Sequence, residues 1–157
     1  MILLAQLAVI LALLCVAVVY GTDVFCALVQ RPALARVDDV ALTAVMGNVH
    51  HYGDRRMPVP GAVGLVASAA AAVLAAIAGG TGAAITAGSA TLLLISWTVV
   101  YARISAPINR TLTAASDDHR TPEDARSLQN SWDRVIVVRA ALQGLAVLAL
   151  GITLILT

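Results

Sequence analysis

The sequence predicts an all-α integral membrane protein, a bundle of four transmembrane helices. Of its 157 residues, 60% are apolar and only 12% are charged, about half the charged fraction of an ordinary soluble domain. Four apolar stretches are each long enough to cross a hydrocarbon layer of roughly 30 Å. Little chain remains outside them, so one domain spanning residues 1–157 is expected. The net charge of +1 gives no reason to expect a nucleic-acid partner.

The first predicted span runs from about residue 2 to residue 25. It is longer than the apolar core of a secretory signal and no basic segment precedes it, so we interpret it as a retained span. A polar zone follows. Within it, apolar residues recur at helical spacing from Ala33 to Val49, which predicts an amphipathic helix at the membrane interface. Pro58 and Pro60 are typical of the first turn of the next helix.

The second span is expected at about residues 61–78. Its Gly64 and Ser68 lie four residues apart, a spacing that allows a neighbouring helix, or a second copy of the chain, to approach closely. The sequence Gly79–Gly82 predicts a tight turn into the third span, residues 83–106.

Proline and polar residues mark the remaining boundaries. Pro107 is expected to disturb or end the third span. Thr121 and Pro122 then match the N-cap and first position of a short helix in the polar loop that follows. The fourth span is expected at about residues 135–156.

Eight of the ten arginines predict the orientation of the chain. Four lie between the first and second spans and four between the third and fourth: Arg31, Arg36, Arg55 and Arg56, then Arg110, Arg120, Arg126 and Arg134. Basic residues favour the cytoplasmic side, so both connections are expected in the cytoplasm of a bacterium. The protein would then lie in the inner membrane with both termini outside.

Arg139 is the most informative single position. It follows the start of the fourth span by about five residues, where an unpaired guanidinium would be costly. Asp23, near the inner end of the first span, is the natural partner for an ion pair. Trp132 lies seven residues before Arg139 and therefore shares its helix face. The pair would either form part of a site or fix the bundle.

His50, His51 and Tyr52 form a second group of candidates at the end of the amphipathic segment. Adjacent histidines on a helix point about 100° apart and cannot both coordinate one metal ion. A metal site on His50 or His51 would need ligands from elsewhere, such as His119 or Asp23. No motif for an organic cofactor is present, so the cofactor stays unknown.

Several of these residues together resemble the family of small four-span membrane proteins named after the fungal anthrone oxygenases. The similarity extends over nearly the whole chain. It is carried by Gly21, Pro32, Tyr52, Gly53, Pro58, the run Pro107-Ile108-Asn109, Leu112, Trp132 and Arg139.

The resemblance implies oxidation of a lipophilic phenolic anthrone by dioxygen. On this basis His50 or His51 would act as the base, and Arg139 with Asn109 would stabilise the enolate oxygen. Trp132, with Tyr52 and Asp23, would line the substrate pocket. We expect this pocket to face the cytoplasm, between spans one, three and four, and to be roofed by the segment that holds His50 to Tyr52.

Two other classes of function remain open. The chain would serve as an accessory or ligand-binding subunit if its small-residue faces joined it to a larger membrane complex or to a second copy. A transporter is the third alternative, although no long inverted repeat is present. In each case the expected partners are the lipid bilayer and a small lipophilic ligand.

Overall fold

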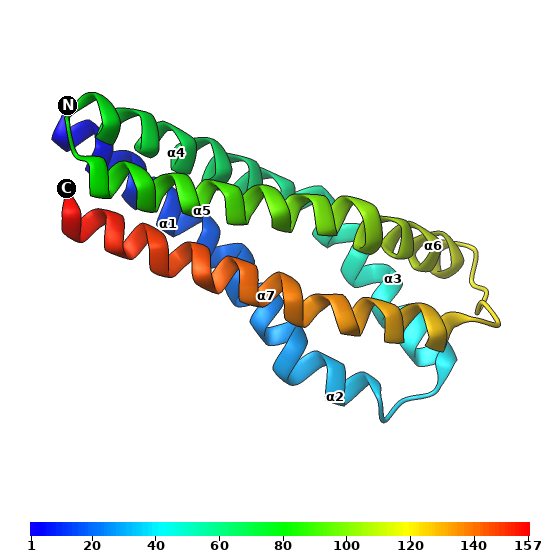
Figure 1. The fold of residues 1–157 in the computed structure, drawn as a ribbon. Helices are drawn as coiled ribbons and strands as arrows, with labels where there is room; N and C mark the ends of the chain where they lie inside the picture. The colour runs from blue at the N-terminus through cyan, green and yellow to red at the C-terminus, as the bar shows by residue number, and fades with distance from the viewer. The chain divides into compact units, whose positions relative to one another are not determined.

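The computed structural model describes residues 1–157, which form five continuous helices (Figure 1). Four of them are long and apolar enough to cross a membrane: Ile2–Leu34, Pro58–Ile77, Thr81–Asp117 and Ala125–Leu156. The protein is therefore an all-α, multi-pass membrane protein, as the sequence predicts. In detail the elements are α1 (Ile2–Phe25), η1 (Cys26–Gln30), α2 (Arg31–Leu34), α3 (Asp39–Arg56), α4 (Pro58–Ile77), α5 (Thr81–Val100), η2 (Tyr101–Ser105), α6 (Ala106–Asp117) and α7 (Ala125–Leu156).

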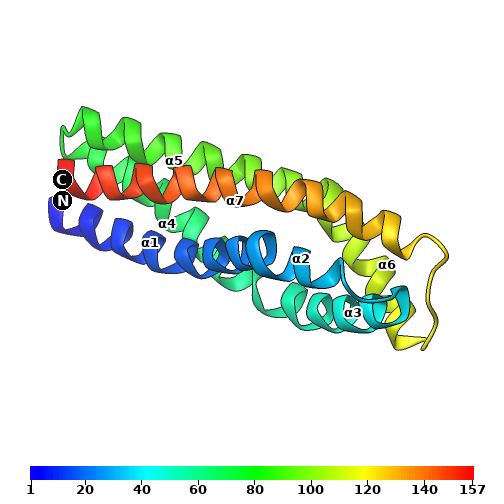
Figure 2. The same ribbon diagram turned by 90° about the horizontal axis from the view of Figure 1, so that it is seen from below.

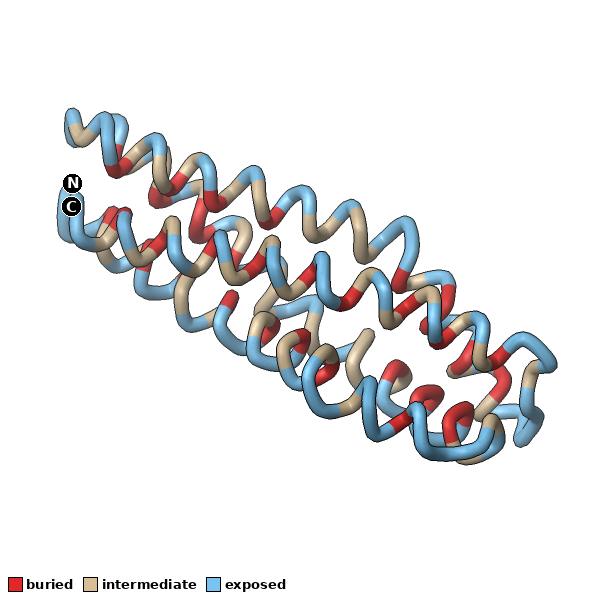
Figure 3. Tube along the Cα trace, turned by 60° about the horizontal axis from the view of Figure 1, so that its bottom comes forward, coloured by how far each residue is buried: buried red, intermediate tan, exposed pale blue.

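The contacts of the chain divide it into two compact units. The first unit contains Met1–Gly21, Val59–Thr98 and Ala141–Thr157, and the second contains Thr22–Pro58 and Val99–Ala140. In both units the buried positions recur on one side of each helix and the exposed positions on the other (Figure 3).

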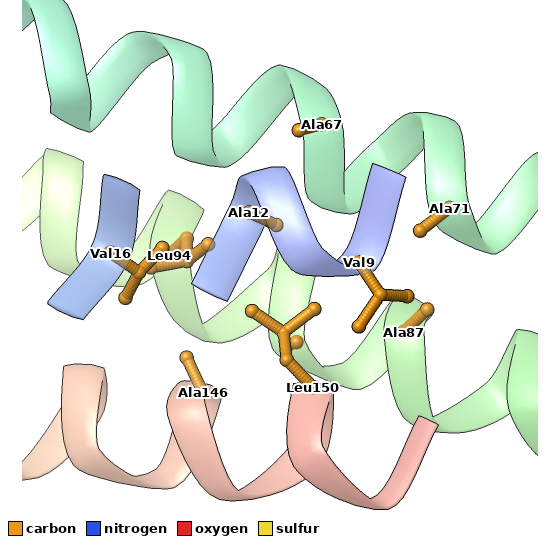
Figure 4. Close-up of a cluster of buried hydrophobic side chains, with 10 residues drawn as sticks. Val9, Ala12, Val16, Ala67, Ala71, Ala87, Leu94, Ala146 and Leu150 are labelled. Atoms are coloured by element: carbon orange, nitrogen blue, oxygen red, sulfur yellow. The ribbon is translucent and has the colours of Figure 1, made fainter. Parts of the chain in front are cut away.

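The first unit is a bundle of four helical segments with an apolar core (Figure 4). The buried positions of each segment are three or four residues apart, the spacing of helices that pack side by side over several turns. The core residues are Val9, Ala12, Val16, Ala67, Ala71, Ala87, Ala90, Leu94, Ala146 and Leu150. Both chain ends and the turn between α4 and α5 lie at one end of this unit (Figures 1 and 2). Gly79 in that turn has φ +81°, so the predicted turn is confirmed.

The small-residue face of the second span packs inside the first unit. A Cβ added at Gly64 would lie 2.9 Å from Cγ2 of Val16, so α1 and α4 approach closely at this point. The Ser68 hydroxyl lies 2.9 Å from the hydroxyl of Thr91 on α5. This face is therefore used for packing within one chain.

The second unit has its own apolar core, formed by Cys26, Leu34, Met46, Ile108, Leu112, Trp132 and Ile136. Here α3 packs against α6 at Gly47, where an added Cβ would overlap Ser116 and lie 2.7 Å from the carbonyl oxygen of Leu112. Arg126 joins the α2–α3 corner to α7, because its guanidinium donates to the carbonyls of Leu34 and Val37 and to Asp39. Asp38 caps α3 by accepting from the amide of Ala41.

Pro107 disturbs the third span, as expected, but the expectation that it could end the span is wrong. The helix continues to Asp117, and the five-residue π turn η2 ends at Ser105, two residues before the proline. In this turn the amide of Ala106 donates to the carbonyl of Tyr101, five residues back, which rearranges the bonding just before the missing proline amide. The same arrangement precedes Pro32, where the Arg31 amide donates to the carbonyl of Cys26.

Two other expected boundaries also differ. No separate short helix begins at Thr121, since residues 120–124 form a loop and turn and α7 starts at Ala125. The helix expected at Ala33–Val49 runs instead from Asp39 to Arg56, after a break at residues 35–38. It buries one side, including Leu42, Met46 and His50, against the rest of the second unit, so it is a packed helix of the fold.

Candidate functional site

Most of the buried polar side chains lie in the second unit. They are Asp23, Thr43, His50, Ser105, Asn109, Gln129 and Arg139. Buried polar groups need partners, and within a membrane protein such residues mark functional sites by default. Five of the seven join into one cluster with Asp54, Tyr101 and Trp132.

Arg139 and Asp23 form the ion pair that the sequence suggested. Arg139 Nη2 donates to Asp23 Oδ1 at 2.8 Å, and the two side chains are 8% and 4% exposed. Arg139 Nη1 donates to the hydroxyl of Ser105 at 3.0 Å. The guanidinium also lies over the rings of Tyr101 and Trp132, at 5.3 Å and 5.9 Å from their centroids.

Asp54 connects three further residues of the cluster. Its Oδ1 accepts from the Tyr101 hydroxyl and from Asn109 Nδ2, both at 2.8 Å. The Oδ1 of Asn109 accepts in turn from Trp132 Nε1 at 3.0 Å. Because each hydrogen bond fixes the next, the indole and the amide are held in one orientation.

His50 packs beside this network. Its ring centroid is 5.6 Å from that of Trp132, with the two planes inclined at 52°. The residue is 4% exposed, and its Nε2 has no hydrogen-bond partner. Burial lowers the pKa of His50 from 6.5 to about 4; Asp54 partly offsets this effect and Arg139 adds to it. The imidazole is therefore neutral at pH 7.

A groove of about 320 Å³ opens between α3 and α6 next to His50. Its lining includes His50, His51, Asp54, Arg110 and Thr113. A volume near 300 Å³ is the lower end of the range for small-molecule sites. The sequence placed the expected pocket between spans one, three and four, under the segment that holds His50 to Tyr52. The groove is lined by that segment, in α3, and by α6, which continues the third span, and not by spans one or four.

Comparison with known protein families gives a match. A family model described as anthrone oxygenase covers residues 46–149, which is more than half of the chain. The chain belongs to the anthrone oxygenase family. No curated protein and no solved structure matches it significantly.

The part that matches the anthrone oxygenase family holds most of the cluster. His50, Asn109, Trp132 and Arg139 lie inside it, whereas Asp23 lies before it. Gly21 and Pro32, which also suggested the resemblance, fall outside the matched residues. The similarity therefore rests on a shorter stretch than the nearly complete chain expected from the sequence.

Two predicted site residues lie away from the cluster. His51 is half-buried at the groove, with Nδ1 4.0 Å from Oδ2 of Asp117. Tyr52 is exposed on the outer side of α3, where Arg56 lies 5.2 Å from its ring centroid. No group of three or more His, Cys, Asp or Glu side chains gathers as a metal site would.

Asp54, Tyr101 and Ser105 are in the cluster but were not among the predicted site residues. Asp54 is four residues after His50 and so lies on the same face of α3. Tyr101, Ser105 and Asn109 recur every four residues along one helix and all enter the cluster. These spacings were visible in the sequence, but Asp54 lies beside Arg55 and Arg56 and resembles a solvated surface charge.

Proposed function

We propose that this member of the anthrone oxygenase family oxidises a lipophilic aromatic substrate of the anthrone type with dioxygen. The observation that carries the proposal is His50: a buried, neutral imidazole with an unpartnered Nε2, beside a groove of about 320 Å³. A neutral imidazole accepts a proton without first losing one. It is therefore available as a general base at neutral pH.

His50 is preferred over His51 as the base because of its surroundings. It contacts the Trp132 ring and lines the groove together with Asp54, which holds Tyr101 and Asn109. His51 lies near Asp117 on the more exposed side of the same helix. Trp132 does not line the groove, and in this assignment it supports the His50 ring, against which the flat substrate lies.

Asn109 and Arg139 stabilise the developing enolate oxygen in different ways. The Asn109 Nδ2 has two hydrogens, one of which is directed to Asp54, so the second is available to an oxyanion. Arg139 is bound by Asp23 and Ser105, and its contribution is the positive charge it places in a water-poor site. Asp23 holds that charge in position. Tyr52, on the outer side of α3, serves the entry of the substrate from the membrane.

The proposed reaction balances without a further reductant. His50 removes one proton from the CH₂ carbon of the anthrone, and the resulting enolate carbon gives electrons to O₂ and forms a C–O bond. The proton returns to the outer oxygen, which gives a hydroperoxide. The second C–H proton is then lost as the O–O bond breaks, which leaves a carbonyl and releases water.

In this proposal the site lies at the cytoplasmic surface of the membrane, and α3 and the charged connections support that position. The outer side of α3 exposes Val45, Val49 and Tyr52 next to Arg55 and Arg56, the pattern of a helix at the surface of an anionic membrane. The arginine-rich connections favour the cytoplasmic side of a bacterial inner membrane, with both termini outside. A lipophilic substrate would then enter the groove from the bilayer.

The test is turnover of a hydroxylated anthrone by the protein in lipid nanodiscs, measured as quinone absorbance and oxygen uptake above the protein-free rate. His50→Gln is expected to lower kcat/KM by about 10²- to 10⁴-fold, the usual contribution of a general base. His51→Gln is expected to retain most of the rate.

The matched control is His119→Asn. His119 lies in the loop after α6 with φ 53°, a conformation that asparagine also tolerates. Its turnover should equal that of the wild type. Wild-type protein that does not exceed the protein-free rate, or a His50→Gln variant with the rate of His119→Asn, would remove the proposal.

One observation favours a second candidate function. Arg139 and Asp23 are buried and paired, as two residues that only fix the fold would be. The protein would then bind a lipophilic ligand, or act as an accessory subunit of a membrane complex, without converting the ligand. Saturable binding of the anthrone with no oxygen uptake would support this alternative.

A further inference from the structure

A second groove lies between α2 and the first turns of α7. Its larger part, of about 590 Å³, is lined by residues that include Leu28, Arg31, Pro32, Asn130, Asp133 and Arg134. An adjoining space of about 290 Å³ shares Asn130 and Asp133 with it and reaches Gln129. All of these residues belong to the second unit, and none lines the groove beside His50.

The charges of this groove favour an anion. Arg31 and Arg134 bring two positive charges and Asp133 one negative charge, with Arg31 Nε 3.9 Å from Asp133 Oδ2. Arg126 also lines the smaller space, but its charge is neutralised by an ion pair with Asp39. The groove therefore carries a net positive charge that an anionic group would neutralise.

Gln129 adds a hydrogen-bond acceptor to the groove. The residue is 1% exposed, and its Oε1 has no partner. Its Nε2 donates to Asp133 Oδ1 at 2.8 Å, which fixes the orientation of the amide. A buried acceptor without a partner is costly, so the groove is suited to a ligand that brings a hydroxyl or amine donor.

The groove has an apolar border of the kind expected at the level of lipid headgroups. Leu28, one turn before Arg31, is 72% exposed and lines the groove. Val137 and Val138, one turn after Arg134, are also exposed. On both helices the exposed surface thus changes from apolar to charged within one turn, as it does where a membrane protein leaves the hydrocarbon layer.

We propose that the α2–α7 groove is a site for an anionic phospholipid with a hydroxylated headgroup, of the phosphatidylglycerol type. The phosphate lies between Arg31 and Arg134. A headgroup hydroxyl donates to Oε1 of Gln129, and the acyl chains follow Leu28 and Val138. This inference is independent of the oxygenase proposal, because none of its residues takes part in the proposed reaction.

Native mass spectrometry of the detergent-solubilised protein, titrated with single lipids, tests the site. Phosphatidylglycerol is expected to bind one molecule per chain, at least fivefold tighter than phosphatidylcholine, which has no net charge and no donor. Phosphatidylmethanol, with the same charge and no headgroup hydroxyl, should fall between them. Arg31→Gln and Arg134→Gln should each weaken phosphatidylglycerol binding about fivefold, as expected for one basic residue at an anionic lipid surface.

Arg120→Gln is the control, because it removes the same charge from an exposed arginine that pairs with Asp118. Its affinity should match that of the wild type. Equal binding of phosphatidylglycerol and phosphatidylcholine, or an equal loss in Arg120→Gln and Arg134→Gln, would overturn the proposal. Soluble glycerol phosphate that competes as strongly as the lipid would also overturn it, because the occupant would then be a soluble phosphate.

Discussion

Burial keeps His50 uncharged, and the proposed chemistry depends on that state. The lowered pKa of about 4 has burial as its first cause, with the nearby Arg139 adding to it. Sequence alone could not separate His50 from His51, because adjacent residues differ only in which helix face they present. Packing against Trp132 makes the distinction.

The pH dependence of turnover follows from this pKa. Because neutral His50 is the active form, kcat/KM should rise as the pH increases through about 4 and stay level from about pH 5 to 7. An unburied histidine would instead give a rise near pH 6.5. The measurement is the pH profile of anthrone turnover in nanodiscs, and a midpoint at 6 to 7 would contradict the assignment to His50.

Stability should depend on the same group. The folded-state pKa is lower than the unfolded-state value, so the contribution of His50 is fully present above about pH 6.5 and is lost as the pH falls toward 4. The free energy of unfolding should fall by about 3 kcal/mol over this pH range. Thermal unfolding of the wild type at pH 7 and pH 5 should show this dependence, and His50→Gln should reduce it.

The ion pair of Arg139 and Asp23 gives a second prediction. Arg139→Met leaves a buried carboxylate and should destabilise the fold by about 3–5 kcal/mol, whereas replacing both residues, Asp23→Leu with Arg139→Met, should recover much of the loss. Thermal unfolding in detergent measures both. If the single and double variants were equally destabilised, removing Asp23 would not relieve the loss, and the unpaired carboxylate would not be its cause. The pair was predictable from sequence, because each member is a rare charge in an apolar span.

At the scale of the elements, the structure differs most from the sequence prediction at α3 and at the two π turns. Five-residue π turns directly precede Arg31-Pro32 and Ala106-Pro107, and each helix continues past its proline. A proline in the sequence indicates a helix that is disturbed or ended, and which of the two occurs depends on the hydrogen bonds before it, which cannot be read from residue types. The four spans were predictable because twenty apolar residues have few alternatives to crossing a membrane.

The crossing of α3 over α6 can be tested at one glycine. Gly47→Ala should destabilise the second unit by about 1–3 kcal/mol, because the new Cβ would overlap Ser116 and approach the Leu112 carbonyl. Gly53→Ala, on the same helix with open space around it, should be neutral or stabilising by up to about 1 kcal/mol. Thermal unfolding of the two variants measures the difference, and a similar effect in both would contradict the close crossing.

At the scale of the whole molecule, four candidate spans and the arginine distribution predict one orientation in the membrane. A reporter that fluoresces only in the cytoplasm should be active when inserted in the loop after Asp118 and inactive when fused after Thr157. The reverse pattern would place the groove beside His50 on the outer side. The charge asymmetry can be read directly from the residues, whereas the groove could not be predicted because it depends on packing between distant segments.

The central claim is that a flat aromatic substrate reacts beside His50. An experimental structure of the protein in lipid with the quinone product bound tests it most directly. The account predicts the product in the groove between α3 and α6, with a carbonyl oxygen or the reacting carbon within about 3.5 Å of His50 Nε2. A product bound elsewhere, with the His50 groove filled by protein side chains, would contradict the account.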